Sequence, residues 1–444
     1  MARSLPKLIL TGLVRPLWLT ALASLLLAAV PGVVYGQGIP DELDLETALR
    51  LATEQHPALK GSAAVVAGTE GLILQGGLRP NPLFTVQTEN WRFGGEPSFH
   101  VGSDLDLFAY VSQPFELGGK RERRVELAEQ ERTIAELQQR QLVWQIRQEV
   151  RRAFWRAFLA QREFELLEEN ARVFEQITNY HEVRVREGAM AEADLIRVRL
   201  EEERLQLTRE EAAVQAERSR SDLVRAMGGG AYNPDFRLLG SPVTSLPDQG
   251  APVAQLISTA LQARPDLQAV AGELERARRK VLLEEAQSRP NWDLLFGYKR
   301  TEGFNTVLAG VSVPLPFFDR NQGTILFSRS DVDRAEASLR ERQLRIRTEI
   351  QRAVSALARR VSMLRKIEQG MLQHAEESWQ ISLAAYREGA TDLLRLLDAQ
   401  RSRNEVRLLR IRTRLELQMS LVDLEEAVGA ENLAIGLETV GVQR

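Results

Sequence analysis

The chain has 444 residues and a formal net charge of −3, from 58 basic and 61 acidic side chains. Its hydrophobic share of 44% and charged share of 27% exclude a disordered chain and a polytopic helical membrane protein, and the near-neutral charge excludes a strongly basic nucleic-acid-binding protein. The chain has no cysteine, which excludes disulfides, thiolate metal sites and cysteine nucleophiles, and only four histidines, so we expect no metal site and no cofactor.

The first 36 residues have the pattern of a secretory signal peptide. Three basic residues precede an apolar run at 17–30, and small residues follow up to Gly36. The alternative is a single transmembrane anchor, but the run is shorter than the about 20 residues that a bilayer requires. We therefore predict a signal peptide at 1–36 and a mature chain outside the cytoplasm. No later stretch is apolar enough for a membrane helix, so any membrane-spanning part must consist of strands.

The mature chain repeats itself after about 200 residues, a period far longer than that of a solenoid. The recurring segments are His56-Pro57-Ala58-Leu59 with Arg264-Pro265-Asp266-Leu267, Arg79-Pro80-Asn81 with Arg289-Pro290-Asn291, Val111-Ser112-Gln113-Pro114 with Val311-Ser312-Val313-Pro314, and Arg186-Glu187-Gly188-Ala189 with Arg387-Glu388-Gly389-Ala390. Their common order indicates a duplicated unit. We predict a first structural repeat at 37–230, a proline-rich linker at 231–253, a second repeat at 254–430 and a C-terminal tail at 431–444.

Each repeat begins with helical patterns and continues with two strands. In the first repeat, helices are predicted at 44–56 and 58–78, before a break at Arg79-Pro80-Asn81-Pro82. Strands are predicted at about 83–92 and 100–113 in the first repeat, and at about 291–301 and 304–314 in the second. Their alternating side chains and their length suit tilted transmembrane strands of about 9–11 residues. The alternative is a pair of soluble β-hairpins packed on helices, but the signal sequence favours membrane strands.

Long helices follow the strands in both repeats. No proline or glycine interrupts the segment from Lys120 to Arg186, and apolar residues there recur at coiled-coil spacing. A glycine then marks a turn in each repeat, at Gly188 and at Gly389. We predict long helical hairpins at about 120–228 and about 321–428.

Four strands are too few to close a barrel, because the smallest single-chain barrels have eight. Unpaired strand edges do not persist in lipid, so several chains would have to contribute. Three copies would supply twelve strands, although edge pairing alone does not exclude other numbers.

With these features, the sequence resembles the TolC family of outer-membrane efflux channels over nearly all of residues 40–430. The duplicated plan, the Arg-Pro-Asn segments and both glycine turns carry the resemblance. The run Gln113-Pro114-Phe115-Glu116-Leu117-Gly118-Gly119-Lys120-Arg121 resembles the CzcC-like branch, which is associated with heavy-metal efflux of the resistance–nodulation–division type.

The resemblance implies a mixed α and transmembrane β fold in the outer membrane. It implies a homotrimer with a twelve-stranded barrel in contact with lipid, above a long α-helical periplasmic barrel. It further implies an exit duct of a tripartite system that conducts substrates passively, with heavy-metal cations as a candidate cargo. The partners would be a periplasmic adaptor protein and an inner-membrane pump of the resistance–nodulation–division type, with no nucleic acid.

The resemblance also assigns residues at the helical tips. It places Asp194, Tyr386 and Asp398 at the pore constriction. The sequence departs from the family at Arg395, where the first of two pore-ring acids would stand, and at Thr391, where the family has an arginine. We therefore include Arg395 among the gate residues and expect the constriction to be held by a different pairing. The resemblance implies adaptor docking at the tips, at Gly188 and Gly389.

Several alternatives remain open. The glycines within 58–78 are many for a helix interior, since each costs up to about 1 kcal/mol against alanine. We interpret His56, His100, His181 and His374 as ordinary surface or capping residues. The sequence shows no Ser/His/Asp or carboxylate-pair pattern of a catalytic site, so we expect that the protein is not an enzyme. The competing functions are a soluble periplasmic coiled-coil scaffold, or the same channel serving organic solutes or protein secretion.

Overall fold

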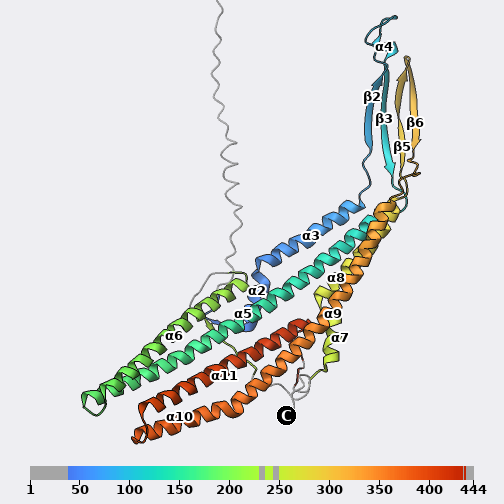
Figure 1. Cartoon of the computed structure of the whole chain (residues 1–444). Helices are drawn as coiled ribbons and strands as arrows, with labels where there is room; N and C mark the ends of the chain where they lie inside the picture. Colours follow the sequence, from blue (N-terminus) through green and yellow to red (C-terminus); the bar gives the residue numbers. More distant parts are fainter. Residues whose placement is uncertain (1–38, 230–235, 244–249, 434, 437–444) are drawn as a thin grey trace, which may run out of the picture.

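The computed structural model of the chain describes residues 39–229, 236–243, 250–433 and 435–436. The predicted signal peptide at 1–36 lies outside these residues, as do parts of the predicted linker and tail. The described chain is elongated: a four-stranded sheet forms one end, and the turns of two helical hairpins form the other (Figure 1).

The first repeat contains four long or medium helices and two long strands. They are α2 (Leu45–Gln55), α3 (Pro57–Gly77), β2 (Leu83–Glu89), β3 (Asp106–Phe115), α5 (Lys120–Arg186) and α6 (Glu192–Ala226), with a short helix α4 (Val101–Asp104) between the strands. Two-residue strands β1 (Glu42–Leu43) and β4 (Arg237–Leu238) pair in parallel beside the helices. The glycine-rich segment predicted at 58–78 does form a helix, α3, although most of its residues are exposed.

The second repeat follows the same order. It comprises α7 (Val253–Ala263), α8 (Pro265–Gln287), β5 (Trp292–Thr301), β6 (Phe304–Ser312), α9 (Gln322–Lys366), a π-helical turn η1 (Ile367–Met371), α10 (Leu372–Arg387) and α11 (Leu393–Val428). The π-helical turn contains Gly370 and interrupts a segment that the sequence predicts as continuous α-helix.

The prediction of a strand over 100–113 is wrong at its start. Residues Val101–Asp104 form the short helix α4, because the Asp104 carboxylate accepts from the His100 backbone N–H at 3.0 Å while the Asp104 N–H donates to the His100 carbonyl at 2.8 Å. Strand β2 also ends earlier than predicted, at Glu89, because Asn90 has a left-handed backbone with φ of 63°.

The four long strands form one antiparallel sheet in the order β2-β3-β5-β6. The register aligns one apolar side chain beside the next across all strands, through Val86, Ala109, Tyr298 and Val307 in one row and Phe84, Val111, Phe296 and Ala309 in another. Most of these side chains are exposed. The sheet therefore carries a continuous apolar surface on one face.

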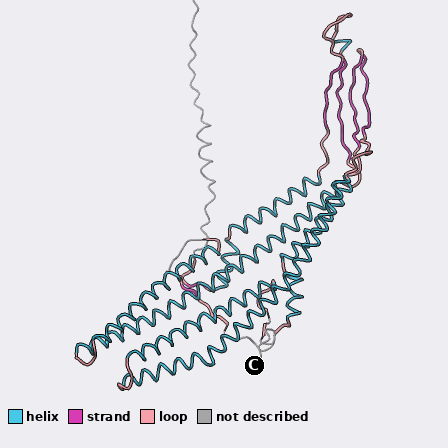
Figure 2. Tube along the Cα trace, in the orientation of Figure 1, coloured by secondary structure: helices cyan, strands magenta, loops and turns pink. Residues whose placement is uncertain are grey.

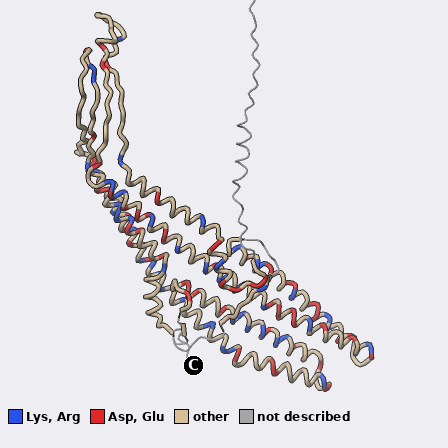
Figure 3. The backbone as a smooth tube through the Cα atoms, turned by 180° about the vertical axis from the view of Figure 1, so that it is seen from behind, with Lys and Arg blue, Asp and Glu red and all other residues tan. Residues whose placement is uncertain are grey.

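The helices keep the order of the strands. Helix α3 packs along α5, α5 along α8, and α8 along α9, and all of them begin or end at the level where the strands stop (Figure 2). Charged residues are spread along the helices and are sparse on the strands (Figure 3). Within the described part of the chain, the helices lack the combination of length and hydropathy that is needed to cross a membrane.

The helical region has two main apolar cores. The first joins α2, α5 and α6 to the β1–β4 pair, with Phe154, Phe158 and Phe236 fully buried. The second joins α7 and α9 to the C-terminal half of α11, around Ile346, Ile350 and Leu424. Because α11 contributes to both cores, it holds the two repeats together.

Candidate functional site: the helical tips and the strand–helix junction

The two hairpin turns have the same backbone geometry. Gly188 and Gly389 are left-handed, with φ of 73° and 74°. In each turn, the next alanine N–H reaches back five residues: Ala189 to the Arg184 carbonyl at 2.9 Å, and Ala390 to the Ala385 carbonyl at 2.8 Å. This is the Schellman arrangement, in which glycine supplies the left-handed residue at no steric cost. The Gly turns predicted from the sequence therefore end α5 and α10 by the same mechanism.

A side-chain hydrogen bond joins the two repeats just above the turns. The Tyr386 hydroxyl of α10 lies 2.8 Å from Nε2 of His181 on α5, and the two rings are stacked with centroids 6.0 Å apart. His181 is 1% exposed, and its Nδ1 lies 2.7 Å from the Ile177 carbonyl. Burial raises the pKa of Tyr386, with a further contribution from the charge of Asp194, so its hydroxyl keeps its proton and remains a donor.

An apolar cluster surrounds this hydrogen bond. It contains Phe174 of α5, Val198 of α6, and Leu393 and Leu397 of α11, with Tyr386 partly buried against it. Figures 1 and 3 show the α5–α6 and α10–α11 hairpins side by side at this end of the molecule. The tips are therefore packed on one another within a single chain.

Asp194 acts electrostatically on Tyr386, and the other predicted gate residues, Arg395 and Asp398, lie on the surface. Asp194 lies 3.8 Å from Arg197 on its own helix. Arg395 and Asp398 are both exposed on α11, and the Asp398 carboxylate lies 3.8 Å from Arg401. A pairing of Arg395 with Asp398, between layers or between chains of an oligomer, is therefore a proposal.

The sequence-based interpretation of His181 as an ordinary surface or capping histidine is wrong, because this side chain is buried. The same interpretation is correct for His56, which caps α3 by accepting from the Ala58 N–H at 3.2 Å. A signal for His181 was present: Phe174, Thr178 and His181 step by four and then three along α5, and all three are buried. This helical periodicity places His181 on the core-facing side.

A polar layer lies next to the apolar cluster, farther from the turns. A cavity of about 240 Å³ between α5, α6 and α11 is lined by Asn170, Gln400 and Asn404 among others. Each of these buried amides has a side-chain atom without a hydrogen-bond partner among the described residues. The contact between the two hairpins is therefore apolar at the tip and polar above it.

The motif at 113–121 forms the junction between strands and helices. The Glu116 carboxylate accepts from Arg124 at 2.5 and 2.8 Å, and Arg124 also donates to the Gly76 carbonyl at the end of α3. The hydrogen bonds from Arg124 lower the pKa of Glu116. A side chain on Gly118, whose φ is 78°, would lie 2.5 Å from the Arg289 side chain. The motif therefore has a structural role at the junction between the strands and the helices.

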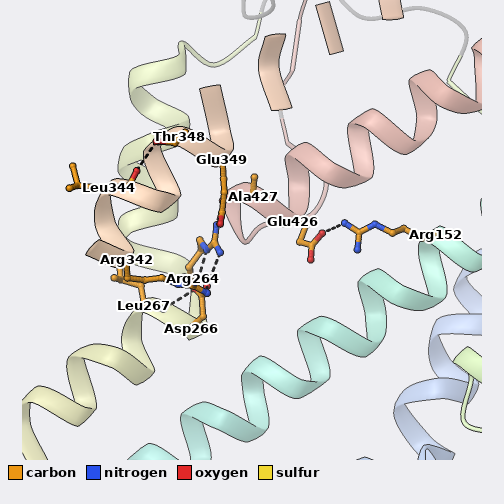
Figure 4. A network of polar contacts seen from close by, with 10 residues as sticks. All are labelled: Arg152, Arg264, Asp266, Leu267, Arg342, Leu344, Thr348, Glu349, Glu426 and Ala427. Atoms are coloured by element: carbon orange, nitrogen blue, oxygen red, sulfur yellow. Dashed lines mark hydrogen bonds and ion pairs between the residues drawn. The ribbon is translucent and has the colours of Figure 1, made fainter. Parts of the chain in front are cut away.

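A buried ionic cluster ties the start of the second repeat to its end (Figure 4). Arg264 donates to both carboxylate oxygens of Asp266 at 3.0 and 2.7 Å, to Glu349 of α9 at 2.6 Å and to the Ala427 carbonyl of α11 at 2.9 Å. Arg342 also contacts Asp266. The cluster borders a cavity of about 470 Å³, across which Arg152 of α5 contacts Glu426.

The described residues contain no group of three or more His, Asp or Glu side chains arranged to hold a metal ion. The main features of the structure are a sheet with one apolar face, two hairpin tips joined by a hydrogen bond, and buried contacts between the repeats.

The profile of the family described as "Outer membrane efflux protein" matches residues 50–229 and 256–430. The chain is 27% identical, over 84% of its length and 87% of the relative's, to the "Cobalt-zinc-cadmium resistance protein CzcC" of Cupriavidus metallidurans. Its fold is similar to that of CusC, with a TM-score of 0.73 and 16% identity over 87% of this chain and 92% of that one. It is also similar to VceC of Vibrio cholerae, with a TM-score of 0.69 and 18% identity over 87% of this chain and 96% of that one.

Proposed function

The chain belongs to the outer membrane efflux protein family, and on that premise we propose that it is the outer-membrane exit duct of a tripartite efflux system. Membership of the family confirms the prediction of an outer-membrane efflux channel over a soluble scaffold, and the prediction that the chain is not an enzyme. The oligomer, the gate, the partners and the cargo are the finer parts of the proposal.

The observation that carries the proposal is the sheet. Its order leaves β2 and β6 as edge strands, and its one apolar face is mostly exposed. In lipid, the backbone groups of an edge strand need a partner. Pairing of β6 of one copy with β2 of the next satisfies them and closes a ring. We propose a homotrimer with a twelve-stranded barrel, whose apolar face contacts outer-membrane lipid, and with the helices extending into the periplasm.

The helical tips are the proposed gate and docking region. We propose that Asp194, Tyr386, Arg395 and Asp398 lie at the constriction, and that the turns at Gly188 and Gly389 contact a periplasmic adaptor protein. Both turns are exposed, and a side chain added at either glycine would meet no atom of the described residues within 4 Å. Energy would come from an inner-membrane pump of the resistance–nodulation–division type, since the duct itself is a passive conduit.

The proposed cargo is heavy-metal cations. This rests on the relative named for cobalt, zinc and cadmium resistance. A wide pore selects weakly, so the same duct would also pass organic solutes or a secreted protein if its pump delivered them. A metal cargo and an organic cargo predict different results for cells that lack the chain: the first predicts sensitivity to heavy metals, the second sensitivity to organic solutes.

Two measurements test the duct, and a third tests the cargo. Chemical crosslinking of the detergent-purified protein should stop at three chains, and planar bilayers containing it should show discrete conducting channels. A stable membrane-inserted monomer would reject the barrel. For the cargo, a strain that lacks the chain should lose tolerance to cobalt, zinc and cadmium. Loss of tolerance to organic solutes alone would reassign the cargo and leave the duct in place.

A further inference from the structure

We infer that His181 is a positioning residue of the gate: its neutral imidazole accepts the Tyr386 hydrogen bond that holds the two hairpin tips together, and protonation of the imidazole loosens them. The inference rests on the proposed function, because it concerns the closed state of the proposed duct. It adds a residue that the family resemblance does not assign and a dependence of closure on periplasmic pH.

The two nitrogens of His181 have opposite roles. Nδ1 lies 2.7 Å from the Ile177 carbonyl, and a carbonyl only accepts, so Nδ1 carries the proton. In the neutral ring, Nε2 is then the acceptor, and the Tyr386 hydroxyl at 2.8 Å is the donor. Both hydrogen bonds of the imidazole are satisfied only in this tautomer.

Protonation reverses this hydrogen bond. A charged imidazole has a donor on each nitrogen, so Nε2 can no longer accept and would donate to the Tyr386 oxygen instead. The hydroxyl hydrogen would then turn away from His181 and need a new acceptor, beside the apolar cluster formed by Phe174, Val198, Leu393 and Leu397. The ring would also carry its charge at a position that is 1% exposed, which is costly. Acid therefore weakens the contact between α5 and α10.

The neighbouring charges do not cancel this effect. The charged and titratable groups that act electrostatically on Tyr386 are Tyr180 and Arg184 from α5 and Asp194 from α6, and Tyr180 also contacts the His181 ring edge-on, with the ring centroids 5.5 Å apart. From α11, the cluster receives the apolar Leu393 and Leu397. Asp194 already has Arg197 at 3.8 Å, and Arg184 opposes a second positive charge nearby.

The His181–Tyr386 contact does not follow from the internal repeat, because the equivalent positions of the two hairpins hold different residues. The residue three before each turn glycine is Tyr386 in the second hairpin but Val185 in the first, and the residue seven before is His181 in the first but Ser382 in the second. The hydrogen bond joins residues that lie 205 positions apart and belong to different repeats. It is therefore placed to hold one hairpin against the other.

The test compares four channels in planar bilayers: the native chain, His181→Gln, Tyr386→Phe, and His374→Gln as a matched control. The control removes an exposed histidine of α10, the helix that carries Tyr386. Between about pH 8 and about pH 5, the native open probability should rise about tenfold, because opening the tips hydrates the protonated imidazole that the closed tips bury. His374→Gln should behave like the native channel.

The two tip variants should each abolish the pH response in a different way. Glutamine at 181 retains an acceptor but does not titrate, so His181→Gln should stay closed at both pH values. Phenylalanine at 386 cannot donate, so Tyr386→Phe should be more open at both. An equal rise with acid in the native channel and in His181→Gln would overturn the inference while leaving the duct intact.

Hydrogen exchange of the detergent-purified protein gives a readout that needs no conduction. At about pH 5, backbone amides of 174–190 and 380–393 should exchange faster in the native protein than in His181→Gln, each measured at the same pH. Equal exchange would overturn the inference even if no variant conducts. Absence of conducting channels in all four proteins would instead reject the proposed duct.

Discussion

The Lys120 ammonium nitrogen lies 2.5 Å from the side-chain oxygen of Asn291, across 171 positions of sequence. Lys120 begins α5, and Asn291 directly precedes β5, so the contact joins the first long helix of one repeat to the strands of the other. Burial lowers the pKa of Lys120, and its side chain is almost inaccessible. The strand–helix junction is thus a partly buried polar layer around a buried Lys120, and substitutions there should affect stability.

Gly118 should be the glycine of this junction that tolerates substitution least. Gly118→Ala places a Cβ 2.5 Å from the Arg289 side chain on a left-handed backbone, and should lower the free energy of unfolding by at least about 1–2 kcal/mol. The matched control is Gly68→Ala in α3, where a Cβ meets open space and should stabilise the helix by up to about 1 kcal/mol. Thermal unfolding followed by circular dichroism measures both. Equal effects would contradict the role assigned to Gly118.

The Glu116–Arg124 pair should make the junction sensitive to acid. Hydrogen bonding from Arg124 lowers the folded-state pKa of Glu116 below its ordinary value of 4.5. The pair therefore stabilises the fold fully above that value, and the stabilisation is lost as the pH falls through the lowered pKa. Glu116→Gln should cost about 1 kcal/mol at neutral pH, since the pair is partly exposed, and should be less sensitive to acid. Parallel stability–pH curves for both proteins would refute this.

Removing Asp266 should be among the most damaging single changes in the second repeat. Asp266→Ala leaves Arg264 buried without its bidentate partner, and should cost about 3–5 kcal/mol. Asp331→Ala removes a partly exposed carboxylate that pairs with the exposed Arg334 at 3.1 Å on the same helix, and should cost less than about 1 kcal/mol. Denaturant unfolding in detergent gives both values. A similar loss of unfolding free energy in the two variants would mean that the ionic cluster in Figure 4 does not stabilise the contact between the helices.

Two buried glutamines of α5 should respond oppositely to the same substitution. Neither side-chain polar atom of Gln148 has a hydrogen-bond partner among the described residues, so Gln148→Leu should stabilise the protein by about 1 kcal/mol or more. Gln161 donates to the Leu238 carbonyl at 3.1 Å and accepts from its N–H at 2.9 Å, so Gln161→Leu should cost about 1–3 kcal/mol. The melting temperatures of the two variants and the native protein test this prediction. A Gln148→Leu protein less stable than the native one would mean that the Gln148 amide has hydrogen-bond partners.

Adjacent residues of β6 should differ in how they tolerate arginine. Val311 is 62% exposed on the apolar face and lies opposite Leu294, whereas Ser312 points to the other face, opposite Asp293. On the proposed lipid face, arginine costs about 2–4 kcal/mol at mid-bilayer and about 0–1 kcal/mol near the interface, while on the inner face it stays hydrated. Val311→Arg should therefore reduce the yield of assembled oligomer in outer-membrane fractions more than Ser312→Arg. The opposite ranking would reverse the assignment of the faces.

The sequence by itself determined the features that depend on local chemistry. Hydrophobic periodicity predicted the long helices and most of each strand, because side-chain direction repeats every 3.6 residues in a helix and every 2 in a strand. Gly188 and Gly389 predicted the turns, because few other residues adopt the left-handed backbone found there. The resemblance to the efflux family, built on the same segments, is confirmed by the family match.

Only the tertiary structure decided how residues far apart in the chain meet. No local pattern pairs His181 with Tyr386, or Lys120 with Asn291, because these contacts depend on how two repeats are packed together. The short helix at 101–104 also escaped prediction, since the hydrogen bonds between Asp104 and the His100 backbone outweigh the alternation of apolar residues there. Propensity and periodicity act within a few residues, whereas a partner for a buried polar group is fixed only once the helices are packed.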